Sequence, residues 1–172
     1  MTPLGTPKFI TLHWTAGTYD QTFPEYHWCV KGDGTAVQTL SMQEKGAHCW
    51  GRNTGNIGVS MCAMAPHHPV TPVQVEHTAK LVAELCHLYG IDPRATVQLA
   101  AKKVQGDALV DAPGNVTAPT IADHAFFARK DGYYPERWDI GEFHIPIQHK
   151  AQWYFDALAK GTAKPEFATH VK

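Results

Sequence analysis

The chain lacks an excess of either charge. Its 172 residues carry 15 basic and 16 acidic side chains, which leaves a formal net charge of −1. Proteins that bind nucleic acid or an anionic membrane surface through charge carry a basic patch or stripe, and a balanced composition provides no such footprint. We therefore expect neither nucleic acid nor a membrane among the partners of this protein.

Long apolar runs are also missing. No stretch approaches the ~18 consecutive apolar residues of a transmembrane helix. The first residues of the chain lack the basic segment and the apolar run of a signal peptide. The sequence therefore predicts a protein that is made in the cytoplasm without a signal peptide.

Internal repeats and linkers are absent as well. With 172 residues, of which 44% are hydrophobic, the chain is long enough to bury a core of its own. We expect a monomer with a single domain over residues 1–172. Its core is expected to span about 9–160, and residues 161–172 to form a mobile tail.

The four cysteines do not form a Cys-x-x-Cys pair. Each of them lies in an otherwise apolar stretch, such as Trp28-Cys29-Val30, which indicates reduced packing residues. Two disulfides in a protein that is exported late are the alternative that the spacing leaves open.

Strand patterns dominate the first third of the chain. Phe9 to Leu12 fit a buried strand, which delivers His13 to its end before the turn-prone residues 15–17. Residues 26–40 predict a β-hairpin around a Gly-Asp-Gly turn. Residues 57–62 fit a buried central strand. Polar side chains at strand ends commonly build sites, which makes His13 a candidate.

Helix signals follow in the second half. An N-cap at Thr71, Pro72 and a capping-box Gln74 begin a helix that ends at Gly90. A final helix is expected over about 147–160. Between the two helices, residues 95–101 fit either strand or helix, and residues 106–119 have the composition of a loop. We expect the polar segment Gly106–Gly114 to rim a groove.

Histidine is common, with 11 residues in the chain, and most of them have ordinary explanations. A lone histidine beside apolar residues is more often a hydrogen-bonded core residue than a metal ligand. No His-Glu-x-x-His pair is present. A metal site therefore depends on partners for His13 from elsewhere in the chain.

Five motifs in a fixed order supply those partners. They are Leu-His-Trp-Thr-Ala-Gly around His13, Tyr-His-Trp-Cys-Val-Lys-Gly-Asp-Gly-Thr from Tyr26, His48 before Asn-Thr-Gly-Asn-Ile-Gly-Val at 53–59, His124, and Arg137-x-Asp139. Together they resemble the type 2 N-acetylmuramoyl-L-alanine amidases, which include phage endolysins and peptidoglycan recognition proteins. The resemblance covers about residues 9–141. It implies an α/β fold, with a central mixed β-sheet and flanking α-helices.

The resemblance implies a zinc site. The ligands of this site fall at His13, His124 and Asp139. The chain is thus expected to be a single zinc amidase domain with one Zn²⁺ per chain. Zn²⁺ accepts imidazole nitrogen and carboxylate oxygen, and a catalytic site keeps its fourth position open. Asp123 and Glu136 lie close enough in sequence to compete with Asp139 for the third place.

Two further residues are assigned to the chemistry by the same resemblance. Tyr26 matches the family tyrosine that orients or deprotonates the attacking water, because the glutamate that some members use is Ser60 here. Arg137 stands where lysine is usual. Arginine stays protonated, so that it can hold a developing oxyanion but is a poor proton donor.

The groove wall is expected to hold the substrate through His48 and Asn56. The reaction implied is hydrolysis of the amide between the lactyl group of N-acetylmuramic acid and L-alanine of peptidoglycan. The simplest source is a phage-type endolysin, a bacteriolytic enzyme that reaches the cell wall after its release. A peptidoglycan-binding module without catalysis and a cytosolic amidase that recycles muropeptides are the alternatives.

Overall fold

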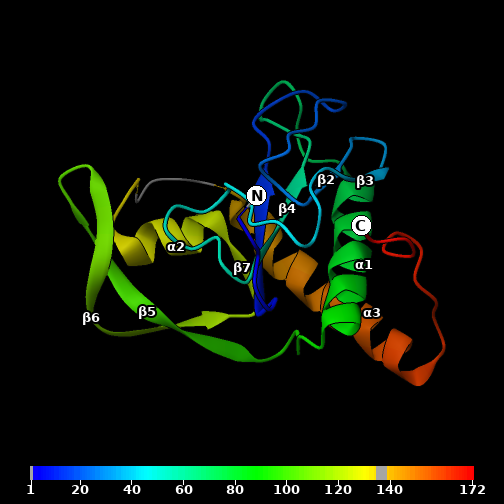
Figure 1. Ribbon diagram of the computed structural model, residues 1–172. Helices are drawn as coiled ribbons and strands as arrows, with labels where there is room; N and C mark the ends of the chain where they lie inside the picture. Colours follow the sequence, from blue (N-terminus) through cyan, green and yellow to red (C-terminus); the bar gives the residue numbers. More distant parts are fainter. Residues whose placement is uncertain (1, 135–138) are drawn as a thin grey trace.

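A five-stranded mixed sheet lies at the centre of the protein (Figure 1). The computed structural model describes residues 2–134 and 139–172. The strand order is β3-β2-β4-β1-β7, in which only the pairing of β2 with β3 is antiparallel. The strands are β1 (Phe9–Trp14), β2 (Trp28–Val30), β3 (Ala36–Gln38), β4 (Asn56–Met61) and β7 (Ile121–Asp123). This arrangement confirms the predicted α/β fold, including the hairpin of β2 and β3 and the central strand β4.

Helices cover both faces of the sheet. Figure 1 shows α1 (Pro72–Tyr89) and α3 (His144–Lys160) on one side and α2 (His124–Asp131) on the other. Because side chains alternate along a strand, Ile10 and Leu12 of β1 join the larger core with α1 and α3. Phe9 joins a smaller core with Phe127 of α2. His13 shares the face of Phe9, and it therefore points toward the α2 side.

The predicted caps of α1 are confirmed. The Thr71 hydroxyl accepts a hydrogen bond from the backbone N–H of Gln74 at 3.1 Å, and the Gln74 side chain accepts one from the N–H of Thr71 at 2.9 Å. Gly90 ends the helix with φ 67°. Gln74 also donates to the carbonyls of Val30 and Cys62, which ties the start of α1 to the sheet.

The loop predicted over residues 106–119 is wrong. This segment pairs with residues before it in a separate two-stranded sheet of β5 (Thr96–Gln105) and β6 (Ala108–Pro119), joined by a two-residue turn. Pro113 and Gly114, which suggested a loop, lie in β6 opposite a register shift between Ala100 and Lys102 of β5. A β-bulge accommodates proline and glycine inside a strand, so composition alone misidentified the element.

The C-terminal residues also differ from expectation. The Glu84 carboxylate accepts hydrogen bonds from the backbone N–H groups of Glu166, Phe167 and Ala168 at 2.8–3.0 Å. The carbonyl of Lys172 accepts one from the N–H of Met42 at 2.8 Å. These contacts argue against the mobile tail predicted for residues 161–172, because they hold the segment against α1 and the sheet. Helix α3 begins three residues earlier than predicted, at His144.

Two smaller expectations concern cysteines and membrane spans. All four cysteines are buried free thiols, which agrees with packing roles. None of the helices in the described part of the chain is long and apolar enough to cross a membrane.

Candidate metal centre and groove

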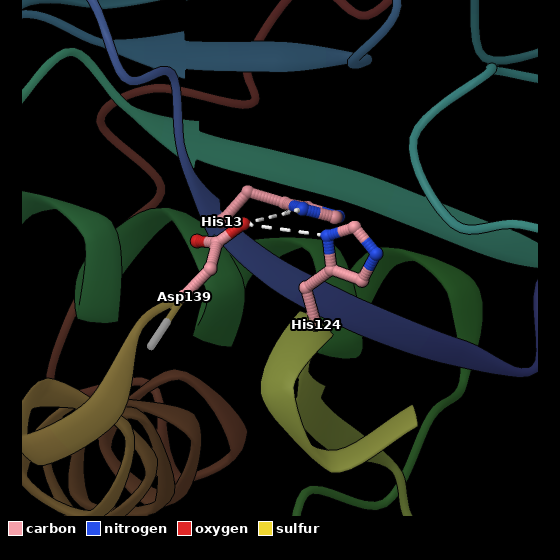
Figure 2. A group of neighbouring side chains, drawn as sticks. All are labelled: His13, His124 and Asp139. Atoms are coloured by element: carbon pink, nitrogen blue, oxygen red, sulfur yellow. Dashed lines mark ion pairs between the residues drawn. The ribbon is translucent and has the colours of Figure 1, made fainter. Parts of the chain in front are cut away.

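Two histidines and an aspartate converge beside the end of β1 (Figure 2). Nδ1 of His13 lies 3.5 Å from Oδ2 of Asp139, and Nδ1 of His124 lies 3.3 Å from the same oxygen. The three atoms that face a common point lie within 4.8 Å of one another. The structure therefore brings together all three residues that the sequence predicted as ligands.

Local structure explains how His124 reaches this cluster. Strand β7 runs parallel to β1, with Asp123 beside Leu12, so that both strands end at the same edge of the sheet. Asp123 then caps α2, because its Oδ1 accepts a hydrogen bond from the N–H of Phe126 at 2.8 Å. His124 is the first residue of that helix, and its ring faces His13 with the ring centroids 4.8 Å apart.

Of the two competing carboxylates, Asp123 is not part of the cluster. Oδ2 of Asp123 accepts a hydrogen bond from the N–H of Ile140 at 3.3 Å, so both of its oxygens serve the backbone. Glu136, the other competitor, and Arg137, predicted to hold an oxyanion, lie outside the described residues.

Asp139 is anionic and oriented. Its Oδ1 accepts a hydrogen bond from the backbone N–H of Trp14 at 2.6 Å, which leaves Oδ2 facing the two histidines. Burial disfavours the charged carboxylate, but the interactions with the neighbouring side chains of His124 and His13 outweigh burial and hold the pKa of Asp139 at about 2. A buried negative charge beside two imidazole nitrogens favours a cation between them.

The donor set fits a divalent metal ion of the zinc type. Imidazole nitrogen and carboxylate oxygen are ligands that Zn²⁺ accepts, and three protein ligands leave a fourth position open. The second oxygen of Asp139 and the Nε2 atom of His13 are hydrogen-bonded to the protein, as metal ligands generally are. The residues that are present therefore fit the metal that the sequence implies.

Tyr26 lies beside this cluster, where the sequence predicted it. Its ring centroid is 5.1 Å from that of His13. Burial, followed by the charge of Asp139, raises the pKa of Tyr26 above its ordinary value. Ser60 is directly opposite His13 in the pairing of β4 with β1, so it occupies the edge of the site.

The two residues predicted to bind substrate are both buried. Nδ1 of His48 lies 2.9 Å from Nε2 of His13, and burial, followed by the charge of His13, lowers the pKa of His48 well below its ordinary value. Asn56 is 0% exposed. Its side-chain amide accepts a hydrogen bond from the Thr11 hydroxyl and donates one to the carbonyl of Arg52. The prediction that Asn56 contacts substrate is therefore wrong, because no face of it is accessible.

A groove with two arms passes the metal cluster. One arm is a cavity of about 540 Å³ and the other one of about 310 Å³. Ala47, His48 and His124 line both. The larger cavity, here called the aromatic arm, is lined in addition by Cys49, Trp50, Gly51, Asn53, Tyr133 and Tyr134. The smaller cavity, here called the Tyr26 arm, is lined in addition by Trp14, Thr15, Ala16, Phe23, Glu25, Tyr26 and Asp139.

Exposed rings give the aromatic arm its character. Trp50 is 40% exposed and Tyr134 is 70% exposed, while Tyr133 packs edge-on against Trp50 with centroids 5.2 Å apart. Sequence reasoning missed these three residues. The signal for them was an aromatic residue two positions after His48 and an aromatic pair in the turn after the His124 helix.

The β5–β6 hairpin supports this arm from behind. Arg52 forms a buried ion pair with Asp131 at 2.6 Å and donates to the carbonyl of Ala100 in β5 at 2.9 Å. Among the described lining residues of both cavities, none falls in 106–114. The predicted rim segment is therefore not among the residues that line the two cavities, although its Leu109 lies directly against Gly51 of the aromatic arm.

The mixed sheet and its helices place two histidines and a carboxylate, a set that could hold a metal ion, beside an open groove, an arrangement typical of hydrolases. Within that class, the chain belongs to the N-acetylmuramoyl-L-alanine amidase family, whose model matches residues 3–132. It is therefore a hydrolase that cleaves an amide bond of peptidoglycan. The match includes His13, Tyr26, His48 and His124, and it ends before Asp139. Among curated proteins, no sequence matches the chain.

Solved structures share the fold at low sequence identity. The Ph2119 endolysin from the Thermus scotoductus MAT2119 bacteriophage Ph2119 is 16% identical with a TM-score of 0.54, over 88% of this chain and 86% of that one. Hydrolase AmiA of Staphylococcus aureus, solved in complex with its ligand, is 15% identical with a TM-score of 0.54, over 95% and 79%. The N-acetylmuramoyl-L-alanine amidase LysC from Clostridium intestinale URNW is 16% identical with a TM-score of 0.51, over 77% and 83%.

Proposed function

We propose that this amidase is a zinc enzyme of the phage-endolysin type, which cleaves the lactyl–L-alanine amide in the intact bacterial wall. The observation that carries the proposal is the convergence of His13, His124 and Asp139 beside the groove, where His124 lines both arms and Asp139 lines the Tyr26 arm. We also propose that it acts as a monomer with one domain and one Zn²⁺ per chain. The balanced charge of the chain gives no support for a nucleic acid as its partner.

His13, His124 and Asp139 would hold the metal. When bound in such a site, Zn²⁺ polarises an amide carbonyl and lowers the pKa of a coordinated water toward ~7. The carboxylate of Asp139 contributes the negative charge, and the N–H of Trp14 keeps its other oxygen out of the groove. Burial of His13, which is 1% exposed, fixes one side of the site as a rigid wall.

Two residues of the chain are proposed to act on the reacting groups. Tyr26 lines the groove beside His13, and its hydroxyl, which the raised pKa keeps protonated, orients the attacking water. Ser60 stands where some relatives have a glutamate and brings no carboxylate, which leaves this role to Tyr26. Arg137 remains the proposed partner of the developing oxyanion on the strength of the sequence alone.

The two arms suggest how the substrate lies. The scissile amide joins a sugar-borne lactyl group to a peptide, so the substrate extends in two directions from the reacting bond. Sugar rings present C–H faces that pack on exposed aromatic rings, which the aromatic arm offers at Trp50 and Tyr134. We assign the glycan to the aromatic arm and the stem peptide to the Tyr26 arm, where Glu25 supplies a charge.

Trp50→Ala tests the glycan assignment. We expect KM on purified wall sacculi to rise about tenfold, since removal of one packed aromatic ring costs about 1–1.5 kcal/mol. The rate at saturation and the zinc content should stay near those of the parent enzyme. Trp153→Ala is the matched control, because Trp153 is 66% exposed on α3 and outside both lining sets. Equal KM values for the two variants would remove the glycan from this arm.

The proposed function itself is tested on the purified protein. We expect one equivalent of zinc per chain, together with new L-alanine amino termini when the enzyme is incubated with sacculi. A chelator should stop the release of these termini, and added Zn²⁺ should restore it. Soluble anhydro-muropeptides are offered in parallel. Faster cleavage of these than of sacculi would favour the recycling alternative, and activity that survives complete zinc removal would overturn the metal assignment.

A further inference from the structure

We propose that His48 is a positioning residue, which sets the tautomer of the metal ligand His13. The inference rests on the proposed metal site. It adds a role to the one that the sequence suggested, which was a substrate contact from the groove wall, where His48 lines both cavities. The ring is buried, with 6% of the residue exposed, and both of its nitrogens are engaged inside the protein.

The hydrogen bonds of His48 determine which ring nitrogens of His48 and His13 carry a proton. The backbone carbonyl of Asn56 can only accept a hydrogen bond, so Nε2 of His48, at 3.1 Å, must donate to it. A neutral imidazole carries one N–H, which leaves Nδ1 of His48 as an acceptor. Nε2 of His13, at 2.9 Å, must then carry the proton of that hydrogen bond.

The tautomer of His13 determines which of its two ring nitrogens can bind the metal. When Nε2 of His13 carries the proton, the lone pair of Nδ1 is available, and Nδ1 is the atom that lies 3.5 Å from the Asp139 carboxylate. A carbonyl of β4 thus determines, through His48, which nitrogen of His13 is offered to the metal. Such a hydrogen bond also fixes the plane of the ligand ring and raises its basicity.

The His48 ring occupies space that is free because two neighbouring residues, Gly46 and Gly58, have no side chain. A Cβ atom added to Gly58 would lie 2.6 Å from Cδ2 of His48, and one added to Gly46 would lie 2.8 Å from the same atom. Both distances are shorter than a side chain tolerates without movement. The backbone carbonyl that accepts from His48 belongs to Asn56, and this residue is held in place as well. Its side chain forms hydrogen bonds with Thr11 at 2.8 Å and with the carbonyl of Arg52 at 2.8 Å.

Three substitutions separate positioning from substrate contact. In His48→Asn, Oδ1 is attached to Cγ as Nδ1 is in histidine, so it can accept the hydrogen bond from His13. In His48→Gln the amide lies one carbon farther out, and His48→Phe has no polar atom. We expect the affinity for Zn²⁺, measured by competition with a chromogenic chelator, to fall about 10- to 100-fold in the Gln and Phe variants. The Asn variant should stay within about threefold of the parent.

A substrate contact would give the opposite pattern. All three variants would then keep the parent affinity for Zn²⁺ and show only a raised KM on sacculi, which would overturn the proposal. A loss of zinc affinity in His48→Asn as large as in His48→Phe would also overturn it, because the acceptor at Nδ1 would then be irrelevant. The failure of the zinc proposal itself is distinct, since it would appear as absent metal in the parent enzyme.

A measurement on the unmodified, zinc-loaded enzyme does not depend on how variants fold. Long-range ¹H–¹⁵N correlation spectra report the tautomer of each histidine. We expect the Nε2–H tautomer for His48 and a scalar coupling between Nε2 of His13 and Nδ1 of His48 across their hydrogen bond. An Nδ1–H tautomer of His48 would overturn the assignment, because that nitrogen could not accept from His13.

Discussion

Replacing His124 by alanine is expected to abolish stoichiometric zinc binding and to lower the hydrolysis of sacculi by about 10³-fold or more. Metal chemistry contributes several kcal/mol to such a reaction, and ~1.4 kcal/mol corresponds to a factor of ten. Among the described residues, the site offers three protein ligands, and removal of His124 leaves His13 and Asp139 as an incomplete pair. Metal analysis and the count of new L-alanine amino termini measure both effects, and His13→Ala should give the same result.

His149→Ala is the control for this prediction, because His149 is an exposed residue of α3. It should keep zinc, activity and the melting temperature of the parent. A chelator should lower the melting temperature of the parent but not that of His124→Ala, since only a protein that binds the metal is stabilised by it. A His124→Ala protein with one zinc per chain would show that the ligand assignment is wrong.

Sequence signals predicted those elements whose cause is local. Thr71 and Gln74 stabilise the start of α1 within one helical turn, and Gly90 ends it, so the caps are visible in the sequence itself. The placement of His13 follows from the alternation of side chains along β1. The order of the family motifs predicted the metal cluster, although His13 is separated from His124 and Asp139 by more than a hundred residues.

The predictions that failed depend on partners remote in sequence. Nothing near residues 166–168 indicates that the carboxylate of Glu84 binds their N–H groups. Nothing within 106–119 shows the pairing with β5 that turns a Pro-Gly segment into a strand. The same limit applies to Asn56, because its burial is decided by Thr11 and Arg52, which belong to a neighbouring strand and loop.

Replacing Tyr26 by phenylalanine is expected to reduce the rate on sacculi by about 10²-fold or more, the range typical of a lost general acid or base. Zinc content and melting temperature should change little, because phenylalanine fills nearly the same volume beside His13. The loss should appear in kcat and in kcat/KM alike, since a hydroxyl that acts on the attacking water contributes in the transition state and not in ground-state binding. Rates are compared at matched zinc occupancy.

Tyr19→Phe provides the matched control, because its hydroxyl also donates a hydrogen bond, to the carbonyl of Pro69 at 2.7 Å, and Tyr19 lines neither arm of the groove. That variant should keep the full rate. If Tyr26→Phe keeps the full rate as well, Tyr26 is a packing residue of the wall. With Ser60 in place of a carboxylate, another residue would then have to orient the attacking water, and Arg137 becomes the next residue to replace.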